Sequence, residues 1–202
     1  MIAIVDYHVG NLGSVTNACK RQGMDVVVTN DPEVIRQADG IILPGVGAFP
    51  AAMSNLEACH LVPVLNEVKD KGTPILGICI GMQLLFEEGS ENGHTKGLGF
   101  LKGSVDKMEV DAKLPHMGWN QLVIKQSHPL LKYVEEGDYV YFVHSYSAHC
   151  PEDEIGAYVN YGGKKITAFV YKDNVMGTQF HPEKSGEIGK KILRAFKELC
   201  SC

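Results

Sequence analysis

Short apolar runs alternate with helix-like stretches through the first half of the chain. The runs are rich in Val, Ile and Leu. The run over residues 40–43 is continuously apolar, as in strands that are buried on both faces. We expect strands over residues 2–6, 25–29, 40–43 and 74–78. Buried strands that alternate with helices predict parallel pairing and a doubly wound α/β architecture.

Helical patterns fill the spaces between these runs. Asp31 supplies a cap and Pro32 a first helical residue, so a short helix is expected to begin there and end before Gly40. A last helix closes the chain and places most of its apolar residues on one face, so it should pack against the sheet. We expect the other helices over residues 14–22, 62–71 and 80–87, and the last over residues 185–199.

The second half changes character, because strand-like runs there follow each other without helices between them. Residues 158–161 and 165–171 flank Gly162 and Gly163, and a short polar turn leads into residues 175–180. This pattern predicts hairpins and therefore a mixed sheet. There is no linker or internal repeat. We predict one α/β domain over residues 1–202, with a mostly parallel central sheet, flanking helices and an antiparallel hairpin extension.

Composition narrows the class of protein. Apolar residues make up 45% of the 202 residues and charged residues 21%, which is typical of a globular chain. The formal net charge of −5 gives no basic footprint for nucleic acid. The N-terminus lacks a signal-peptide pattern, and no apolar run approaches the ~20 residues of a spanning helix. We expect a cytoplasmic protein that binds neither nucleic acid nor membrane.

The six cysteines are scattered without CxxC pairs, so we interpret them as thiols. Cys200 and Cys202 in the terminal CSC could chelate a soft metal, but a frayed tail is the simpler interpretation. The segment GNLGS at residues 10–14 follows the first strand in the manner of a phosphate loop, yet it lacks the Walker lysine and the full GxGxxG pattern. We therefore expect no metal and no cofactor.

The strongest chemical signal is GICIG at residues 77–81, where a buried strand runs directly into a predicted helix. This is the form of a nucleophile elbow with a thiol in place of serine. The turn would hold Cys79 exposed, and the helix N-terminus would stabilise its thiolate. The alternative is a small buried cysteine that serves close packing.

A thiol nucleophile needs a base and a group that orients the base. His181, Pro182 and Glu183 offer both at the end of the predicted strand 175–180, since His181 can move the proton while Glu183 holds the other ring nitrogen. Taken alone, this segment could equally be a capping glutamate beside an ordinary histidine. Glycines in PGVG at residues 44–47 follow the third parallel strand, where backbone N–H groups could face an oxyanion, although a simple turn is the alternative.

Together these segments resemble the class I, triad-type glutamine amidotransferases over nearly the whole chain. The motifs GICIGMQLLF and FHPEKS resemble the nucleophile segment and the His and Glu segment of that class. A second set resembles more narrowly the glutaminase subunits of imidazole glycerol phosphate synthase. That set consists of ILPGVGAF, DYHVGNLGSV, PHMGWNQL and YFVHSY.

The resemblance implies hydrolysis of L-glutamine to glutamate and ammonia through a cysteine thioester. The ammonia would pass through a tunnel to a cyclase subunit, a (β/α)₈ barrel that forms a heterodimer with this chain. The cyclase would make imidazole glycerol phosphate and AICAR from phosphoribulosyl-formimino-AICAR phosphate, a step of histidine biosynthesis. We further expect the isolated chain to hydrolyse glutamine slowly and the cyclase subunit to activate this hydrolysis.

The resemblance also implies residue roles. It places the catalytic nucleophile, base and acid on Cys79, His181 and Glu183. It places the glutamine-binding and oxyanion positions on Gly45, Val46, Gly47, Ile80, Gln83, Glu91, Ser145 and Tyr146. It places partner-interface positions on Asn11, Trp119 and Lys184. Without a partner, Trp119 could instead be a core aromatic and Lys184 a solvated charge.

The sequence departs from the family pattern at two places. His8 stands where the family usually has glycine, and Gly186 stands where a glutamine commonly follows the serine of FHPEKS. Three other functions stay open at this point. They are a glutaminase of another synthase, a silent partner-binding module and a stand-alone cysteine hydrolase.

Overall fold

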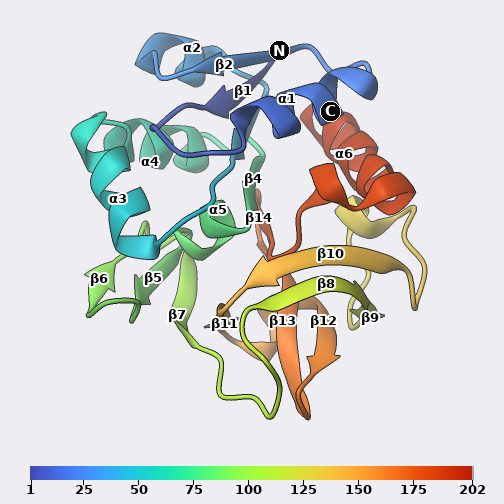
Figure 1. Cartoon of the computed structure of the whole chain (residues 1–202). Coiled ribbons are helices and arrows are strands. Elements are labelled where there is room, and N and C mark those ends of the chain that lie inside the picture. The colour runs from blue at the N-terminus through green and yellow to red at the C-terminus, as the bar shows by residue number, and fades with distance from the viewer. Residues whose placement is uncertain (202) are drawn as a thin grey trace.

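The computed structural model describes residues 1–201 and is built around an eight-stranded mixed sheet (Figure 1). Its strand order is β2 (Val26–Thr29), β1 (Ile2–Val5), β3 (Gly40–Leu43), β4 (Ile75–Ile78), β14 (Val175–Thr178), β13 (Lys164–Lys172), β12 (Ile155–Tyr161) and β9 (Val123–Ile124). The pairs from β2 to β14 are parallel, and those from β14 to β9 are antiparallel. The predicted mixed sheet is confirmed.

Four of the five parallel strands are buried, which explains their largely apolar sequences, while β2 at the sheet edge is partly exposed. Strands β1, β3, β4 and β14 are buried at every residue. Parallel strands must be joined by crossovers, and helices supply most of them here. The helices are α1 (Leu12–Arg21), α2 (Pro32–Gln37), α3 (Phe49–Ala58), α4 (Val62–Asp70), α5 (Ile80–Gln83) and α6 (Gly186–Cys200).

Local chemistry accounts for two of these helices. The Asp31 carboxylate accepts a hydrogen bond from the Glu33 N–H at 2.9 Å, and Pro32 is the first helical residue of α2, as predicted. Helix α6 buries Ile192 and Phe196 completely and packs against α1 and β10 (Tyr139–His144). Its apolar face is therefore part of the core, as the sequence pattern predicts.

The middle of the chain forms two smaller sheets that lie below the parallel strands in Figure 1. One has the order β11 (Tyr146–His149), β7 (Leu101–Lys107), β5 (Phe86–Gly89) and β6 (Thr95–Lys96). The other pairs β10 with β8 (His116–Gln121) in antiparallel register. Short 3₁₀ turns lie at η1 (Pro129–Leu131), η2 (Glu152–Glu154) and η3 (Pro182–Lys184).

The prediction of a helix over residues 80–87 is wrong in length. Helix α5 ends at Gln83, and β5 begins at Phe86, where it pairs in parallel with Leu101 of β7. Tertiary strand pairing overrides the helical preference of this leucine- and glutamate-rich segment. Helix α3 has no counterpart among the predicted elements. Among residues 1–201 we find no helix with the length and apolar character that crossing a membrane requires.

Candidate active site

The segment from β4 to α5 forms the sharp strand-to-helix turn that the sequence predicts. Cys79 has φ 54° and ψ −110°, a strained conformation for a residue with a side chain. The backbone crosses itself closely here. A Cβ atom on Gly81 would lie 1.7 Å from the Leu43 carbonyl oxygen, and one on Gly77 would lie 2.6 Å from the Gly81 carbonyl oxygen. Only glycine fits at either position, so the turn depends on both.

The prediction that Cys79 is exposed is wrong, because its residue is only 4% exposed. Strands β14 and β10 close over the thiol. The Cys79 N–H donates to the Thr178 carbonyl at 2.8 Å, and the Sγ atom lies 4.0 Å from the Val143 carbonyl oxygen. The side chain instead lines a pocket of about 320 Å³. The thiol is therefore reached through this pocket, which has room for a small molecule.

His181 and Glu183 lie together behind this turn. The His181 N–H donates to the Tyr141 carbonyl at 3.0 Å, which ties the start of η3 to β10. The His181 Nδ1 atom lies 2.7 Å from Glu183 Oε1, and the two side chains are 0% and 1% exposed. The Asn11 Nδ2 atom donates to the same carboxylate oxygen at 2.5 Å. A buried histidine with a carboxylate on one ring nitrogen is the arrangement that orients a general base.

The charges of this cluster shift two pKa values in opposite directions. Burial lowers the pKa of His181, but the neighbouring Cys79 and Glu183 outweigh burial and raise it to about 9. Burial raises the pKa of Glu183, but the hydrogen bonds from His181 and Asn11 outweigh burial and hold it below its usual value. The carboxylate is therefore ionised and the imidazole holds its proton firmly. Shifts of this kind mark candidate catalytic groups.

Two buried polar atoms of this pair are left without a hydrogen bond in the part of the chain that the structure describes. They are His181 Nε2 and Glu183 Oε2. Buried polar atoms are nearly always paired. An unpaired ring nitrogen beside a thiol therefore indicates a site that exchanges a proton with a bound ligand.

The pocket brings together residues from four separate parts of the sequence. Seven of the eight predicted glutamine-binding positions line it together with Cys79: Val46, Gly47, Ile80, Gln83, Glu91, Ser145 and Tyr146. Gly45 does not line it. A Cβ atom on Gly45 would lie 2.7 Å from the Tyr7 hydroxyl, and that hydroxyl donates to the Pro44 carbonyl. Tyr7 thus holds the segment that carries Val46 and Gly47.

Two further residues of the site were not predicted. Gln179 is fully buried, its Nε2 atom lies 3.8 Å from Cys79 Sγ, and its Oε1 atom accepts a hydrogen bond from Gln83 Nε2 at 3.0 Å. His144 lines the pocket wall beside Ser145. Gln179 lies two residues before His181, so a polar residue at the end of a buried strand was the available signal for it.

Glu91 and Gln83 already have partners within the chain. The Glu91 carboxylate accepts a hydrogen bond from the Phe49 N–H at 2.9 Å, which satisfies one of the free donors at the start of α3. The Gln83 Nε2 atom also lies 3.3 Å from the Tyr146 carbonyl oxygen, while Gln83 Oε1 is buried and unpaired among the described residues. Gln83 is therefore held from the protein side, and its Oε1 atom is not exposed to the pocket.

The three residues expected at a partner interface gather around residues 183–186. Asn11 contacts Glu183, Lys184 follows it in the chain, and a Cβ atom on Gly186 would lie 3.8 Å from the Trp119 ring. Trp119 is 55% exposed, so it is not a core aromatic. The two departures from the family pattern lie at left-handed backbone positions, with φ 62° at His8 and φ 58° at Gly186. Glycine is the residue that such positions favour.

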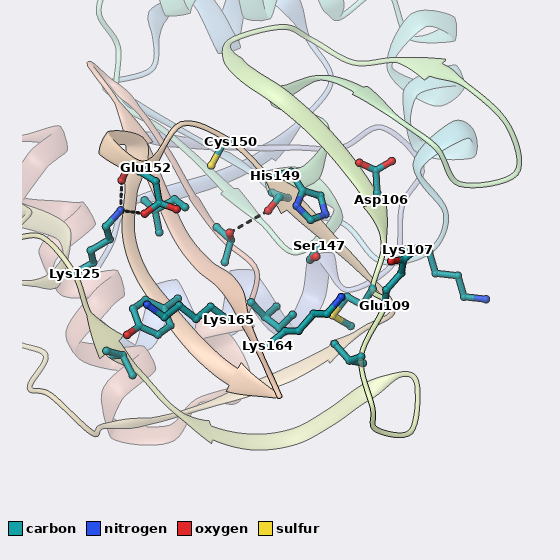
Figure 2. Close-up of a pocket in the computed structure, with 18 of the residues that line it drawn as sticks. Asp106, Lys107, Glu109, Lys125, Ser147, His149, Cys150, Glu152, Lys164 and Lys165 are labelled. Carbon is teal, nitrogen blue, oxygen red and sulfur yellow. Dashed lines mark hydrogen bonds and ion pairs between the residues drawn. The ribbon is translucent and has the colours of Figure 1, made fainter. Parts of the chain in front are cut away.

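A second pocket of about 620 Å³ lies between the smaller four-stranded sheet and β12 and β13 (Figure 2). Lys125 and Glu152 form an ion pair at one end, and Lys107 and Glu109 lie at the other. None of the predicted site residues lines it. No group of three or more His, Cys, Asp or Glu side chains within residues 1–201 is arranged to hold a metal ion. Cys200 ends α6, and Cys202 lies outside the described residues.

Comparisons with known proteins agree with this geometry. The chain matches the model of the family described as glutamine amidotransferase class-I over residues 3–199. It is 55% identical to the imidazole glycerol phosphate synthase subunit HisH of Lactococcus lactis over 98% of both chains. It is 54% identical to the same subunit of Bacillus cereus strain G9842 over 98% of this chain and 94% of that one. A crystal structure of a glutamine amidotransferase, 18% identical, covers all of both chains with a TM-score of 0.79.

Proposed function

Because the chain belongs to the class I glutamine amidotransferase family, we propose that it is the glutaminase subunit of an imidazole glycerol phosphate synthase. In this role it hydrolyses L-glutamine to glutamate and ammonia and supplies the ammonia to a cyclase subunit, as in histidine biosynthesis. The observation that carries the proposal is the strained Cys79, which opens on a pocket beside the buried pair of His181 and Glu183.

In the proposed mechanism, Cys79 attacks the side-chain amide carbon of glutamine as a thiolate. A carbon–sulfur bond forms, and the carbonyl oxygen becomes an oxyanion that the N–H groups of Val46 and Ile80 stabilise. His181 then gives its proton to the leaving nitrogen, so ammonia departs and a thioester remains. A water molecule attacks the thioester while His181 takes its proton, and glutamate and the free thiol are released.

Glu183 and Asn11 do not touch the reacting atoms in this scheme. Glu183 holds His181 Nδ1 and stabilises the protonated ring, which agrees with the raised pKa of His181. Asn11 fixes the carboxylate by donating to Oε1. The acid of the triad is therefore itself held by a residue of α1's N-cap position.

The pocket suits an amino acid of the size of glutamine. The α-ammonium group of the substrate needs an acceptor that the pocket exposes, and Gln83 Oε1, which has no accessible surface, is not one. Glu91 supplies a negative charge at the pocket wall for this ammonium. We assign the remaining contacts with glutamine to the backbone of Gly47, Ser145 and Tyr146.

We further propose that the partner is a cyclase subunit of (β/α)₈ barrel form, in a heterodimer in the cytoplasm. Met117, Trp119 and Tyr139 are large apolar side chains with more than half of their surface exposed, on the neighbouring strands β8 and β10. Exposed apolar side chains that lie together are typical of a docking surface. Asn11 and Lys184 lie at the edge of the same face, beside the catalytic acid.

The test is reconstitution with a cyclase subunit. With its substrate present, glutamine should drive formation of imidazole glycerol phosphate with one glutamate released per product. Added ammonia should replace glutamine. Product formation from ammonia but not from glutamine would contradict the proposal, and so would glutamate release by the lone chain at the full rate of the complex, which would indicate a stand-alone hydrolase.

A further inference from the structure

Two buried histidines, one in the wall of the pocket and one behind it, take no part in the proposed chemistry. His116 of β8 and His144 of β10 face each other directly in the antiparallel register and are 3% and 6% exposed. The His116 ring lies stacked against Tyr161 with centroids 4.0 Å apart and against Phe142 at 4.7 Å. The rings are therefore held rigidly by packing as well as by hydrogen bonds.

The hydrogen bonds of this pair can run in only one direction. His144 Nδ1 lies 2.8 Å from the Tyr146 carbonyl oxygen, and a carbonyl can only accept, so Nδ1 carries the proton. His144 Nε2 is then the acceptor for His116 Nδ1 at 3.0 Å. His116 Nε2 in turn accepts from the Asn120 amide at 3.2 Å. Each ring thus holds one proton at a defined nitrogen.

Both ends of this chain of hydrogen bonds are anchored. At one end the Asn120 amide also donates to the Asn160 carbonyl at 3.0 Å. At the other end the Tyr146 carbonyl accepts from His144 and from Gln83 Nε2, and Gln83 in turn bonds Gln179 beside the Cys79 sulfur. The Tyr146 carbonyl therefore orients the Gln83 amide together with Gln179.

The hydrogen bonds described above require both histidine rings to be neutral. Burial lowers the pKa of His116 to about 4 and that of His144 to about 3, against a smaller opposing effect of the Tyr146 carbonyl on His144. A second proton on His144 would place two N–H groups face to face across 3.0 Å, and a second proton on His116 would face the Asn120 amide N–H across 3.2 Å. The other titratable groups that face the pair are His181, whose charge acts on His144, and Tyr161, which stacks on His116.

We propose that His144, supported by His116, is a positioning residue for the glutamine pocket. It holds the Tyr146 carbonyl, and through that carbonyl it fixes Tyr146 and the Gln83 amide, both of which line the pocket. This inference rests on the proposed function. It concerns how tightly the amino-acid part of the ligand is held and leaves the thiol chemistry unchanged.

The experiment compares two substitutions of one residue, His144→Asn and His144→Gln, in the full chain. Asn can place an amide N–H near the position of Nδ1 and keep the bond to Tyr146. Gln reaches the position of Nε2 and keeps the bond to His116, but it loses the donor to Tyr146. Size alone ranks Gln as the better replacement, so a purely structural role predicts the opposite order.

The readout is inactivation by a chloroketone derived from glutamine, which alkylates Cys79. The dependence of the inactivation rate on the chloroketone concentration gives two quantities: the maximal rate and the concentration at which the rate is half-maximal. His144→Gln should raise that concentration about tenfold and leave the maximal rate within about twofold, while His144→Asn should stay within about twofold in both. Iodoacetamide, which has no amino-acid part, is the control probe and should react with Cys79 equally in all three chains.

The outcomes separate the two proposals. Equal half-maximal concentrations in the three chains, or a larger loss in His144→Asn, would overturn this inference while labelling of the parent chain still supports the proposed function. No saturable labelling of the parent chain would overturn both. Should His144→Gln fail to fold by circular dichroism, the pair His116→Asn and His116→Leu makes the same comparison one residue further back. There, a loss of half-maximal affinity in His116→Leu alone is the supporting result, and equal values overturn the inference.

Discussion

The two pockets described above differ in what faces them as well as in size. The larger, of about 620 Å³, is lined by many charged side chains, of which Lys125 pairs with Glu152 and Lys165 lies 4.7 Å from the ring centre of Tyr158. The smaller, of about 320 Å³, has a strained cysteine in its wall and unpaired buried atoms on Gln83 and on His181 behind it. Backbone strain and unmet hydrogen bonds, rather than volume, distinguish the candidate active site.

The strongest test of this difference between the pockets is to remove the sulfur atom of Cys79. We expect Cys79→Ala to abolish glutamine-dependent glutamate release, by at least about 10³-fold, because no thioester can form. The variant should unfold at a temperature close to that of the parent chain, and the complex should still use ammonia. Glutamate release at the parental rate would show that the nucleophile lies elsewhere.

A smaller effect should separate the two partners of the nucleophile. His181→Ala should reduce turnover more than Glu183→Gln, by about tenfold or more, because His181 moves the proton and Glu183 only holds the ring. The measurement is turnover of the reconstituted complex at saturating glutamine, with circular dichroism as the control for folding. Equal losses, or a larger loss in Glu183→Gln, would contradict these roles.

The pH dependence of stability should follow three histidines whose pKa values burial lowers: His116 and His144 near the small pocket, and His128, also to about 4. The unfolded chain binds protons on His116 and His144 below pH 6.5, whereas in the folded chain their pKa values are about 4 and 3. The unfolded state therefore holds more protons between these limits, and the free energy of unfolding should fall as the pH is lowered from 6.5 to 4.

For His116, the change from 6.5 to about 4 corresponds to at most about 3 kcal/mol. Denaturant unfolding at a series of pH values measures this slope, and His116→Asn should make it shallower. A free energy of unfolding that stays constant over this range would contradict the assignment of neutral buried rings.

The smallest effect is expected at the large pocket. Lys164→Ala and Lys165→Ala remove exposed charges that line it, and we expect glutamate release within about twofold and stability within about 0.5 kcal/mol of the parent chain. Assay of both variants in the reconstituted complex checks this. A tenfold loss in either would show that the larger pocket also serves the reaction, which would remove the contrast between the two regions.

The sequence predicts the parallel half of the fold well because strands buried on both faces carry continuous apolar runs. The two smaller sheets cannot be predicted from apolar runs in this way. In β8 the usual order is reversed, since the polar His116 is buried while Met117 and Trp119 are exposed. A rule that places apolar residues inside and polar residues outside does not predict a strand of this kind. Its environment comes from ring stacking and hydrogen bonds with residues far away in the sequence.

The candidate site divides in the same way. Cys79, His181 and Glu183 lie in short contiguous segments whose residue types match a chemical role, so they could be predicted. The contacts of Asn11 with Glu183 and of Gln179 with Gln83 join residues 172 and 96 positions apart. Such contacts depend on how the strands assemble, and no local pattern encodes them. The site roles themselves stay predictions until the variants are measured.

The close backbone crossing at the cysteine turn also affects how this chain can evolve. Gly81 has no room for a Cβ atom, since one would lie 1.7 Å from the Leu43 carbonyl oxygen. In a saturation-mutagenesis library, every exchange at this position should therefore be depleted, although Gly81 donates no side chain to the chemistry. A descendant that lost its cysteine and its activity would be under the same constraint. Invariance of Gly77 and Gly81 would thus reflect the path of the backbone, and only Cys79 between them would report whether the catalytic activity is retained.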